Sequence, residues 1–334
     1  MPVTIRDVAR AAGVSITTVS RALNGHKDVG EKTRQRILRI AEELNYRPSA
    51  VARSLVTQKT RTIGFLVSDL SKGRIWHYFM LQILYGIQDR LAELGYDLIL
   101  VNTTTTRQRE ISYLDFCTER RLDGVIVINL RLDDPYLHEV VESPLPSVVI
   151  DIPLVSATCG YVTSDNVYGA KLAVRHLIGK GHRTIGFVNG HSQAAVSHDR
   201  LRGYREALES HGIPFRPELV YEADYTVEGG RKGCELLRTA HPEMTAVFFA
   251  SDLMAIGGLH HLREAGVKVP EECAVVGFDD IELAEIVSPQ LTTIRQKRYE
   301  MGATAAEMLV GMMEGKTMPE GRTLLPELVV RQTS

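Results

Sequence analysis

The sequence predicts an α/β protein, in which a small helical N-terminal domain precedes a body of two doubly wound parallel sheets. From residue 61 onward, short apolar segments alternate with amphipathic ones, which is typical of buried parallel strands separated by helices. A chain of 334 residues is also too long for one ordinary core. Residues 1–60 carry 11 Lys and Arg against 5 Asp and Glu, whereas the remainder carries 28 against 36. A basic head on an acidic body favours a head that binds a phosphate backbone.

Two short helices are expected at the start of the chain. Thr4 has the side chain of a helix N-cap, and Asp7 follows three residues later within a short apolar-periodic stretch. Gly13 supplies a sharp turn, because glycine adopts positive φ at little cost. Ser15 then caps a second helix over residues 16–23.

A third helix is expected over about residues 31–44, with an apolar face formed by Ile37, Leu38, Ile40, Ala41 and Leu44. Three short helices with a tight turn between the first two fit a helix-turn-helix, whose second helix enters the major groove of DNA. A helical bundle without this role is the alternative. The second helix carries short polar groups and one arginine, which suit phosphate anchoring and base reading: Thr17, Thr18, Ser20, Arg21 and Asn24.

The segment after the third helix reads as a linker. Pro48 closes that helix, and Ser49 can cap the short stretch A-V-A-R-S-L. Six or seven residues are too few to form a stable helix alone in water.

The body is expected to contain strands over residues 62–68, 96–102, 124–129, 147–151, 184–189, 246–251 and 274–279. Helices are expected between them, among others at Gln82–Leu94, Ala170–Gly179, Arg202–His211 and Gly229–Ala240. In doubly wound sheets, ligands bind beyond the carboxyl ends of the strands. Those ends carry polar side chains, so two facing lobes would form a cleft suited to a polyol or another polar ligand.

An enzyme is one alternative, but the sequence contains no GxGxxG after the first strand, no GxxxxGK[ST], no GxSxG and no HExxH. His191 and His198 are seven apart in an expected loop and are better explained as solvated side chains than as metal ligands. The four cysteines are scattered, without a CxxC pair. We therefore expect no catalytic residue, no cofactor and no metal.

A transport binding protein is the other alternative. The N-terminus MPVTIRDVAR has no apolar region of a signal peptide, and the basic head also argues against transport. No apolar run approaches the roughly 20 residues that span a bilayer. The sequence therefore predicts a cytoplasmic protein.

The head contains three motifs in succession, T-I-R-D-V-A-R-A-A-G-V-S-I-T-T-V-S-R-A-L-N, then T-R-Q-R-I, then L-N-Y-R-P-S-A-V-A-R-S-L. With these motifs it resembles the lactose/galactose repressor (LacI/GalR) family of transcriptional regulators. The family pattern covers nearly the whole chain and implies a periplasmic-binding-protein-like body of two lobes. The implied domains are a helix-turn-helix domain at 1–48, a hinge helix and linker at 49–60, an N-subdomain at 61–161 plus 292–320, and a C-subdomain at 162–291 plus 321–334.

By this resemblance, bases are read by Ile16, Thr17 and Arg21, of which Arg21 could pair with a guanine. Phosphates would be contacted by Ser15, Thr18, Ser20, Asn24 and Thr33. Gly30 departs from the family, in which a serine is common there. The resemblance also implies that residues 49–56 order into a hinge helix in the minor groove, with Leu55 as an apolar wedge and Ala52 beside it.

The resemblance further implies a set of effector-binding residues in the cleft. Asn129 and Asp151 belong to the first lobe, and Arg200, Tyr225, Ser251 and Asp279 to the second. Trp76 is added, although the segment around it departs from the usual family spacing. The implied protein is a repressor that binds a pseudo-palindromic operator as a homodimer.

A sugar or sugar derivative is the expected effector, and a nucleobase is the alternative. Whether the effector releases the protein from DNA or promotes binding stays open. The chain stops at V-V-R-Q-T-S without a heptad tail, which argues against a tetramer.

Overall fold

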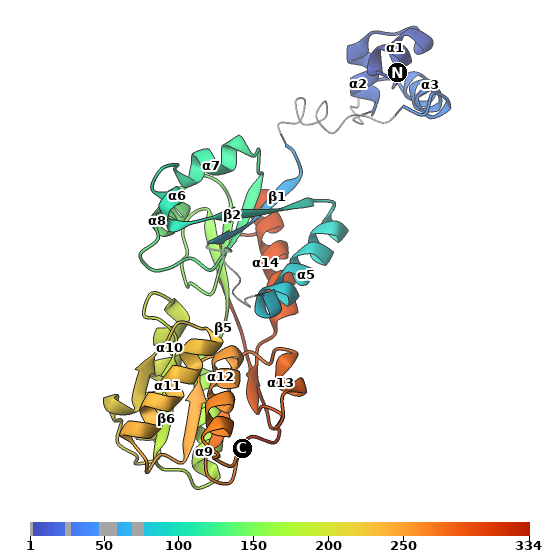
Figure 1. Cartoon of the computed structure of the whole chain (residues 1–334). Coiled ribbons are helices and arrows are strands. Elements are labelled where there is room, and N and C mark those ends of the chain that lie inside the picture. Colours follow the sequence, from blue (N-terminus) through green and yellow to red (C-terminus); the bar gives the residue numbers. More distant parts are fainter. Residues whose placement is uncertain (1–2, 24–27, 47–58, 69–76) are drawn as a thin grey trace. The chain divides into compact units, whose positions relative to one another are not determined.

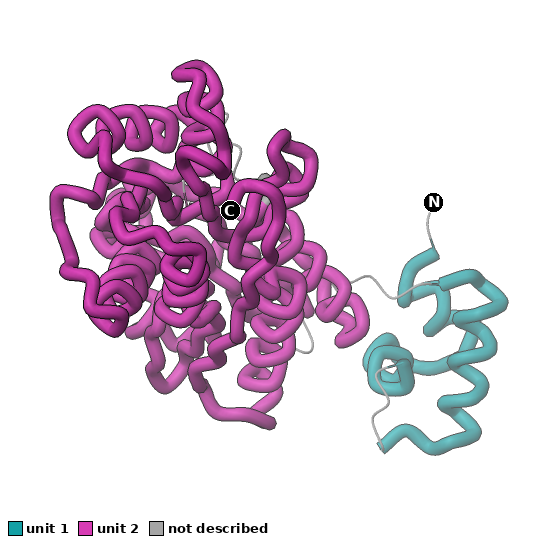
Figure 2. Tube along the Cα trace, turned by 90° about the horizontal axis from the view of Figure 1, so that it is seen from below, with its two compact units in different colours: residues 1–60 teal, residues 61–334 magenta. Residues whose placement is uncertain are grey.

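The computed structural model describes residues 3–23, 28–46, 59–68 and 77–334. Two compact units follow one another along the chain, Met1–Thr60 and Arg61–Ser334 (Figure 2). Several expectations concern residues that lie outside the described ranges, and these are Asn24, the hinge helix with Ala52 and Leu55, and Trp76.

The first unit is a three-helix domain formed by α1 (Ile5–Ala12), α2 (Ile16–Leu23) and α3 (Glu31–Glu43) (Figure 1). The Oδ2 atom of Asp7 accepts hydrogen bonds from the backbone N–H and the hydroxyl of Thr4, as expected for the start of α1, and these bonds lower the pKa of Asp7. Gly13 has φ +61° and turns the chain from α1 into α2.

One small hydrophobic core joins the three helices. It contains Val8, Val19, Ala22 and Ile37 among others. Leu38 was expected on the buried face of α3, but its side chain is 41% exposed. Its neighbour Ile37 is the residue that turns inward, because adjacent helix positions lie about 100° apart.

The first lobe of the body is built on a six-stranded parallel sheet of order β11-β5-β4-β3-β1-β2. Its strands are β1 (Thr62–Ser68), β2 (Asp97–Thr103), β3 (Gly124–Ile128), β4 (Ser147–Ile150), β5 (Cys159–Ser164) and β11 (Gly321–Leu324). Helices cover both faces. On one face, α5 (His77–Leu94) and α14 (Arg298–Met313) pack against Ile63, Phe65 and Val67. The other face carries α7 (Tyr113–Glu119) and α8 (Pro135–Glu142), with the short helix α6 (Thr105–Gln108) before them.

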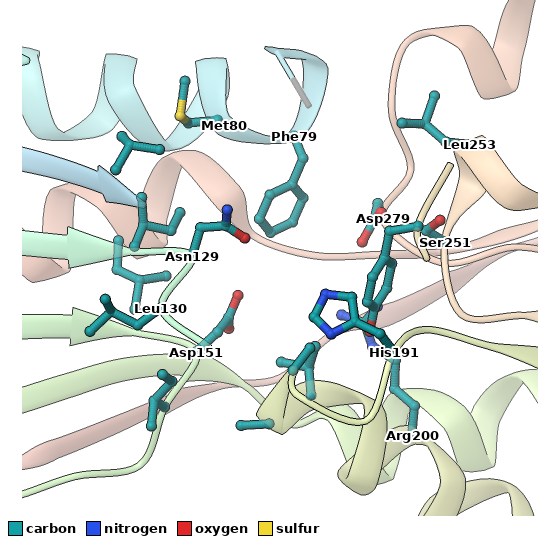
Figure 3. A pocket seen from close by; sticks show the side chains of 18 residues that line it. Phe79, Met80, Asn129, Leu130, Asp151, His191, Arg200, Ser251, Leu253 and Asp279 are labelled. Atoms are coloured by element: carbon teal, nitrogen blue, oxygen red, sulfur yellow. The ribbon is translucent and has the colours of Figure 1, made fainter. Parts of the chain in front are cut away.

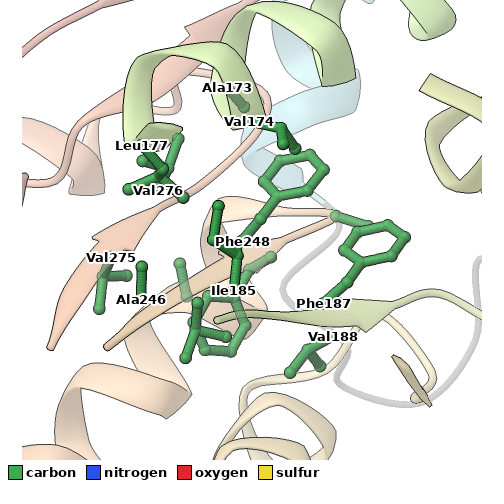
Figure 4. Packing of buried hydrophobic residues seen from close by; sticks show 14 of the residues in the cluster. Ala173, Val174, Leu177, Ile185, Phe187, Val188, Ala246, Phe248, Val275 and Val276 are labelled. Carbon is green, nitrogen blue, oxygen red and sulfur yellow. The ribbon is translucent and has the colours of Figure 1, made fainter. Parts of the chain in front are cut away.

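The second lobe is built on a four-stranded parallel sheet of order β7-β6-β8-β9. Its strands are β6 (Ile185–Asn189), β7 (Val220–Glu222), β8 (Ala246–Phe249) and β9 (Ala274–Val276). Its helices are α9 (Asn166–Gly179), α10 (Ala195–Glu209), η1 (Pro217–Leu219), α11 (Val227–Ala240), α12 (Asp252–Glu264) and α13 (Leu283–Ile286). In the core, the ring of Phe187 stacks on Phe248 at 4.8 Å and on Tyr204 at 5.0 Å between centroids. Figure 4 shows α9 packed over these strands through Ala173, Val174 and Leu177.

Three segments cross between the lobes. The first crossover (residues 163–166) leads from β5 to α9. The second crossover (residues 295–298) leads from β10 (Thr293–Arg295) to α14, and the third connects β11 to β12 (Glu327–Val329). Strands β10 and β12 pair antiparallel, and Ile294 and Leu328 pack with the core of the second lobe.

The strand pairing changes three of the expected domain limits. Residues 321–324 were assigned to the C-subdomain, but they form β11 and pair with β5 in the sheet of the first lobe. Residues 293–295 were assigned to the N-subdomain, but β10 belongs with the second lobe. Strand β5 was not expected, and the limit at residue 161 divides it. Strand β11 is mostly exposed and polar, so its sequence carries no apolar signal.

No helix within the described residues is both long and apolar enough to cross a membrane.

Candidate functional site

Helix α2 presents the three side chains that were expected to read bases. Ile16 is 44% exposed, and Thr17 and Arg21 are exposed as well. Val19 and Ala22, on the other side of the helix, are buried in the three-helix core. An open helix face of this kind can enter a major groove, and base contact by these residues stays a prediction.

Arg21 has a partner that was not expected from the sequence. Its Nη1 atom lies 3.0 Å from Oδ2 of Asp28, and about half of each side chain is exposed. An exposed ion pair of this kind is worth only about 0–1 kcal/mol. Arg21 can therefore exchange this partner for a base or a phosphate at little cost.

Three of the residues expected at phosphates, Ser15, Thr18 and Thr33, lie at or near the starts of α2 and α3. The Oγ atom of Ser15 accepts a hydrogen bond from the backbone N–H of Thr18 at 3.1 Å, so Ser15 caps α2 as expected. Thr33 lies in the first turn of α3, where its N–H donates to the carbonyl of Gly30 at 2.9 Å. Ser20 is half-buried on α2. A helix start favours anions, because its N–H groups and its dipole point toward them.

A pocket lies in the body at the carboxyl ends of β1, β3 and β4 on the first-lobe side and of β6 and β8 on the second-lobe side (Figure 3). It holds about 980 Å³ of empty space, open solvent at its mouth included. Six of the seven residues expected at the effector line it, and these are Asn129, Asp151, Arg200, Tyr225, Ser251 and Asp279.

Four of these pocket residues have a backbone that non-glycine residues rarely adopt. The φ angles are +63° at Asn129, +66° at Asp151, +62° at Tyr225 and +119° at Asp279. Such conformations cost of order 1–3 kcal/mol each and persist where the surrounding structure imposes them, often at functional sites. The strained positions therefore mark the strand ends that aim side chains into the pocket.

The first lobe supplies an amide and a carboxylate. The Nδ2 atom of Asn129 donates to the carbonyl of Ser68 at 2.6 Å, which leaves its side-chain oxygen for a ligand. The Oδ1 atom of Asp151 accepts from the hydroxyl of Thr163 at 3.0 Å. Burial raises the pKa of Asp151, and the nearby positive charge of Arg200 opposes that shift.

Arg200 brings a positive charge to the pocket and is only 3% exposed. Its Nε atom donates to Oδ1 of Asn166 at 2.9 Å, and its Nη1 atom donates to the carbonyl of Ala250. The guanidinium carbon lies 3.9 Å from the centroid of the Phe278 ring. These contacts fix the guanidinium group and leave Nη2 for a ligand. Arg200 was expected ahead of a helix over residues 202–211, but α10 begins at Ala195 and already contains it.

Asp279 is the carboxylate of the second lobe. Its Oδ1 atom accepts from Nε2 of Gln296 at 2.7 Å. Burial raises the pKa of Asp279 to about 6, against the opposing charges of Arg200 and Arg298. The fully buried Asp252 is a neighbour, and burial together with the charge of Asp279 raises its pKa as well.

Tyr225 and Ser251 line the pocket with side chains that are already engaged. The Tyr225 hydroxyl lies 2.7 Å from Oγ of Ser197. The Oγ atom of Ser251 accepts from the N–H of Met254 at 3.3 Å and so caps α12.

His191 was expected to be a solvated side chain, but it lines the pocket. Its ring meets the Tyr225 ring edge-on, with 5.6 Å between the centroids. It follows β6 by two residues, so the strand-end argument used for Asn129 could have found it. Phe79 and Leu253 line the pocket as well, and the sequence did not single them out for this role.

The pocket combines a polar set with apolar walls. Among the described residues that line it, two carboxylates, one guanidinium and one amide offer both donors and acceptors. Much of the remaining lining is apolar, including Val67, Phe79, Met80, Ile128, Leu130, Ile150 and Ile152. The described part of the chain contains no group of three or more His, Cys, Asp or Glu that could hold a metal ion. The arrangement can orient an uncharged polar molecule by hydrogen bonds.

Two family models match the chain. Residues 4–49 match the bacterial regulatory proteins of the lacI family, and residues 174–334 match a periplasmic binding protein-like domain. Catabolite control protein A of Priestia megaterium is 34% identical over 330 residues, which are 98% of each chain. The HTH-type transcriptional repressor PurR of Vibrio campbellii is 36% identical over 99% of this chain and 98% of its own.

Solved structures are similar over the whole chain. The lac repressor dimer bound to operator and the anti-inducer ONPF has a TM-score of 0.83 and 27% identity, and 100% of this chain and 99% of that one are covered. The transcriptional regulator CelR in complex with cellobiose has a TM-score of 0.76 and 32% identity, over 99% and 100%.

A helix-turn-helix head joined to a two-lobed body with a polar pocket defines a DNA-binding transcriptional regulator. The chain belongs to the LacI family of bacterial regulatory proteins. The family resemblance and the fold class predicted from the sequence are confirmed, and so is the predicted function of a DNA-binding regulator.

Proposed function

We propose that this protein is a repressor that is controlled by a sugar or sugar derivative bound in the pocket between its lobes. The observation that carries the proposal is the meeting of Asp151, Arg200 and Asp279 around one pocket. Neighbouring hydroxyl groups of a sugar can donate to carboxylates and accept from a guanidinium group. The relatives support a regulator of this kind, and the CelR structure contains cellobiose.

The pocket also supports a second candidate effector, a nucleobase. Phe79, His191 and Tyr225 bring aromatic rings to the lining. Aromatic rings stack on planar bases, and they also pack on the apolar face of a sugar. The sugar remains our first proposal because two carboxylates suit a ligand with several hydroxyl donors.

We further propose that the head binds a pseudo-palindromic operator as part of a homodimer. One head reads too few bases for tight binding, so two heads on two half-sites are required. In this arrangement Ile16, Thr17 and Arg21 read bases, and Ser15, Thr18, Ser20, Asn24 and Thr33 contact phosphates. Ala52 and Leu55 act in the minor groove. A protein that acts on genes in this way works in the cytoplasm and as a regulator rather than an enzyme.

The effector proposal is tested by thermal shift of the full chain against a panel of sugars and purines. A ligand that binds the native state raises the melting temperature, by an amount that corresponds to about 2.7 kcal/mol at a hundredfold excess over Kd. We expect a sugar to raise it. A shift with purines alone selects the nucleobase, and no shift with any compound contradicts both candidates.

The variant that tests the pocket in this experiment is Arg200→Ala, which should lose the shift, and its matched control is Arg202→Ala. Arg202 lies on α10 like Arg200, but its side chain is 59% exposed and pairs with Asp199. This variant should respond like the wild-type protein. Operator-binding experiments use a DNA duplex that the wild-type protein selects from a random pool.

A further inference from the structure

Among the described residues, each lobe contributes one carboxylate to the pocket, and each of the two accepts a hydrogen bond from a crossover between the lobes. In the first crossover, the hydroxyl of Thr163 donates to Asp151 at 3.0 Å. In the second crossover, Nε2 of Gln296 donates to Asp279 at 2.7 Å. Neither donor lines the pocket itself. Both therefore act on a ligand only through the carboxylates that they hold.

The first crossover also reaches the arginine of the pocket. Asn166 lies at the start of α9, where its Nδ2 atom donates to the carbonyl of Ser164 at 3.0 Å and lies 3.5 Å from the Thr163 hydroxyl. Its Oδ1 atom accepts from Nε of Arg200 at 2.9 Å. A chain of polar contacts thus runs from Asp151 in the first lobe, through the crossover, to Arg200 in the second.

The second crossover holds Asp279 at two points. Besides the contact with Gln296, the N–H of Asp279 donates to the carbonyl of Ile294 at 2.8 Å, next to the crossover. Arg298, at the end of the crossover, donates to the carbonyl of Asp280 at 2.7 Å. Gln296 is only 3% exposed, so water does not readily replace its hydrogen bond to the carboxylate.

A rotation of one lobe against the other changes backbone angles in the crossovers, because they are the covalent links between the lobes. Thr163, at the end of β5, and Gln296, directly after β10, stand where such a change acts. We propose that Thr163 and Gln296 are positioning residues of the effector pocket, which link the orientation of its carboxylates to the arrangement of the lobes. The inference rests on the proposed function, because the link carries a signal only if the pocket binds an effector.

The first test needs no ligand and compares melting temperatures of the full chain at about pH 5 and about pH 7.5. Thr163→Val and Gln296→Met remove the donors with little change of shape. Each donor stabilises the ionised carboxylate. The melting temperature of both variants should therefore fall further below that of the wild-type protein at the higher pH. The charged groups around Asp279 are Arg200, Arg298, Asp151 and Asp252, and they are the same in each variant.

Two controls separate this effect from simple packing. Thr163→Ser keeps the hydroxyl and should behave like the wild-type protein at both pH values. Thr158→Val removes a comparable hydroxyl, which donates to the carbonyl of Ser143 at 2.6 Å, and neither residue is part of the pocket lining. The melting temperature of Thr158→Val should fall below that of the wild-type protein by the same amount at both pH values. If the melting temperatures of Thr163→Val and Gln296→Met fall by the same amount at both pH values, the inference is overturned.

The second test uses cellobiose and guanine as probes, one sugar and one base. For a probe that raises the wild-type melting temperature, we expect its half-maximal concentration to rise about tenfold in Thr163→Val and Gln296→Met. Thr163→Ser and Thr158→Val should match the wild-type protein. Unchanged values in the first two variants would overturn the inference. If neither probe shifts the wild-type protein, the result counts against the proposed effectors alone, and the pH comparison still decides the inference.

Discussion

Nη1 of Arg21 lies 3.0 Å from Oδ2 of Asp28, so the arginine expected to read a base is paired within its own domain. Because the pair is exposed, its strength is at most about 1 kcal/mol. Asp28→Asn should therefore strengthen operator binding, by no more than about fivefold. Electrophoretic mobility shifts with the selected duplex measure the operator affinity of Asp28→Asn and of the wild-type protein.

The control for that variant is Glu43→Gln on α3. It changes the net charge by the same amount, but its ion pair is with Arg39. Equal strengthening by both variants would show that the head responds to total charge and that the pair with Asp28 is not the cause.

Arg21→Ala should relax base discrimination at one position of each half-site, by about 1–3 kcal/mol. The reason is that a guanidinium group can pair with a guanine in two places at once. Binding to a panel of duplexes with single base changes measures the loss. Uniform weakening on every duplex would instead assign Arg21 to a phosphate.

Much of the fold could be predicted because its signals are local. The seven expected strands all exist. In six of them the apolar run is buried in a parallel sheet, whereas the edge strand β2 exposes Ile99 and Leu100. Strand β11 was missed because its four residues, G-R-T-L, carry no apolar run. Strand β10 was assigned to the wrong lobe, since the partner of a short strand is decided by tertiary pairing across the crossovers.

The pocket should make stability depend on pH through Asp279. Burial raises its pKa in the folded state to about 6, above the ordinary value of 3.8. The folded state therefore binds more protons than the unfolded state between about pH 4 and pH 6. The contribution of this group to stability is fully present below pH 4 and is lost as the pH rises through 6.

Asp279→Asn tests this dependence, because asparagine does not ionise. Relative to the wild-type protein, the variant should gain stability between about pH 4.5 and pH 7.5. Urea unfolding at the two pH values measures the difference. If the difference in free energy of unfolding between Asp279→Asn and the wild-type protein does not change with pH, Asp279 titrates normally in the folded protein.

The contact between α5 and α14 depends on Gly86. A Cβ atom at this position would lie 2.0 Å from the carbonyl oxygen of Tyr299. Gly86→Ala should therefore destabilise the body by about 1–3 kcal/mol, because backbone at a helix crossing cannot move aside freely.

Gly179→Ala in α9 is the matched control, because a Cβ atom there would meet nothing within 4 Å. It should be neutral or stabilising by up to about 1 kcal/mol. Urea unfolding compares the two variants. Similar stability of both would contradict the close approach of the two helices.

The candidate site was predictable where the polar residue follows an apolar strand directly. Asn129, Asp151, Ser251 and Asp279 all stand at such places, and the pocket contains all four. His191 was missed because it was judged as a possible metal ligand rather than as a strand-end residue. Thr163 and Gln296 could not be found from the sequence, because their contacts depend on how the crossovers place them beside the carboxylates.

The central claim is that the pocket around Arg200 senses an effector and the head binds DNA separately. The most direct measurement is operator binding by Arg200→Ala, with and without the compound that gives the largest thermal shift on the wild-type protein. We predict wild-type operator affinity without the compound and no response to it, whereas Arg202→Ala responds normally. A normal response of Arg200→Ala would contradict the account.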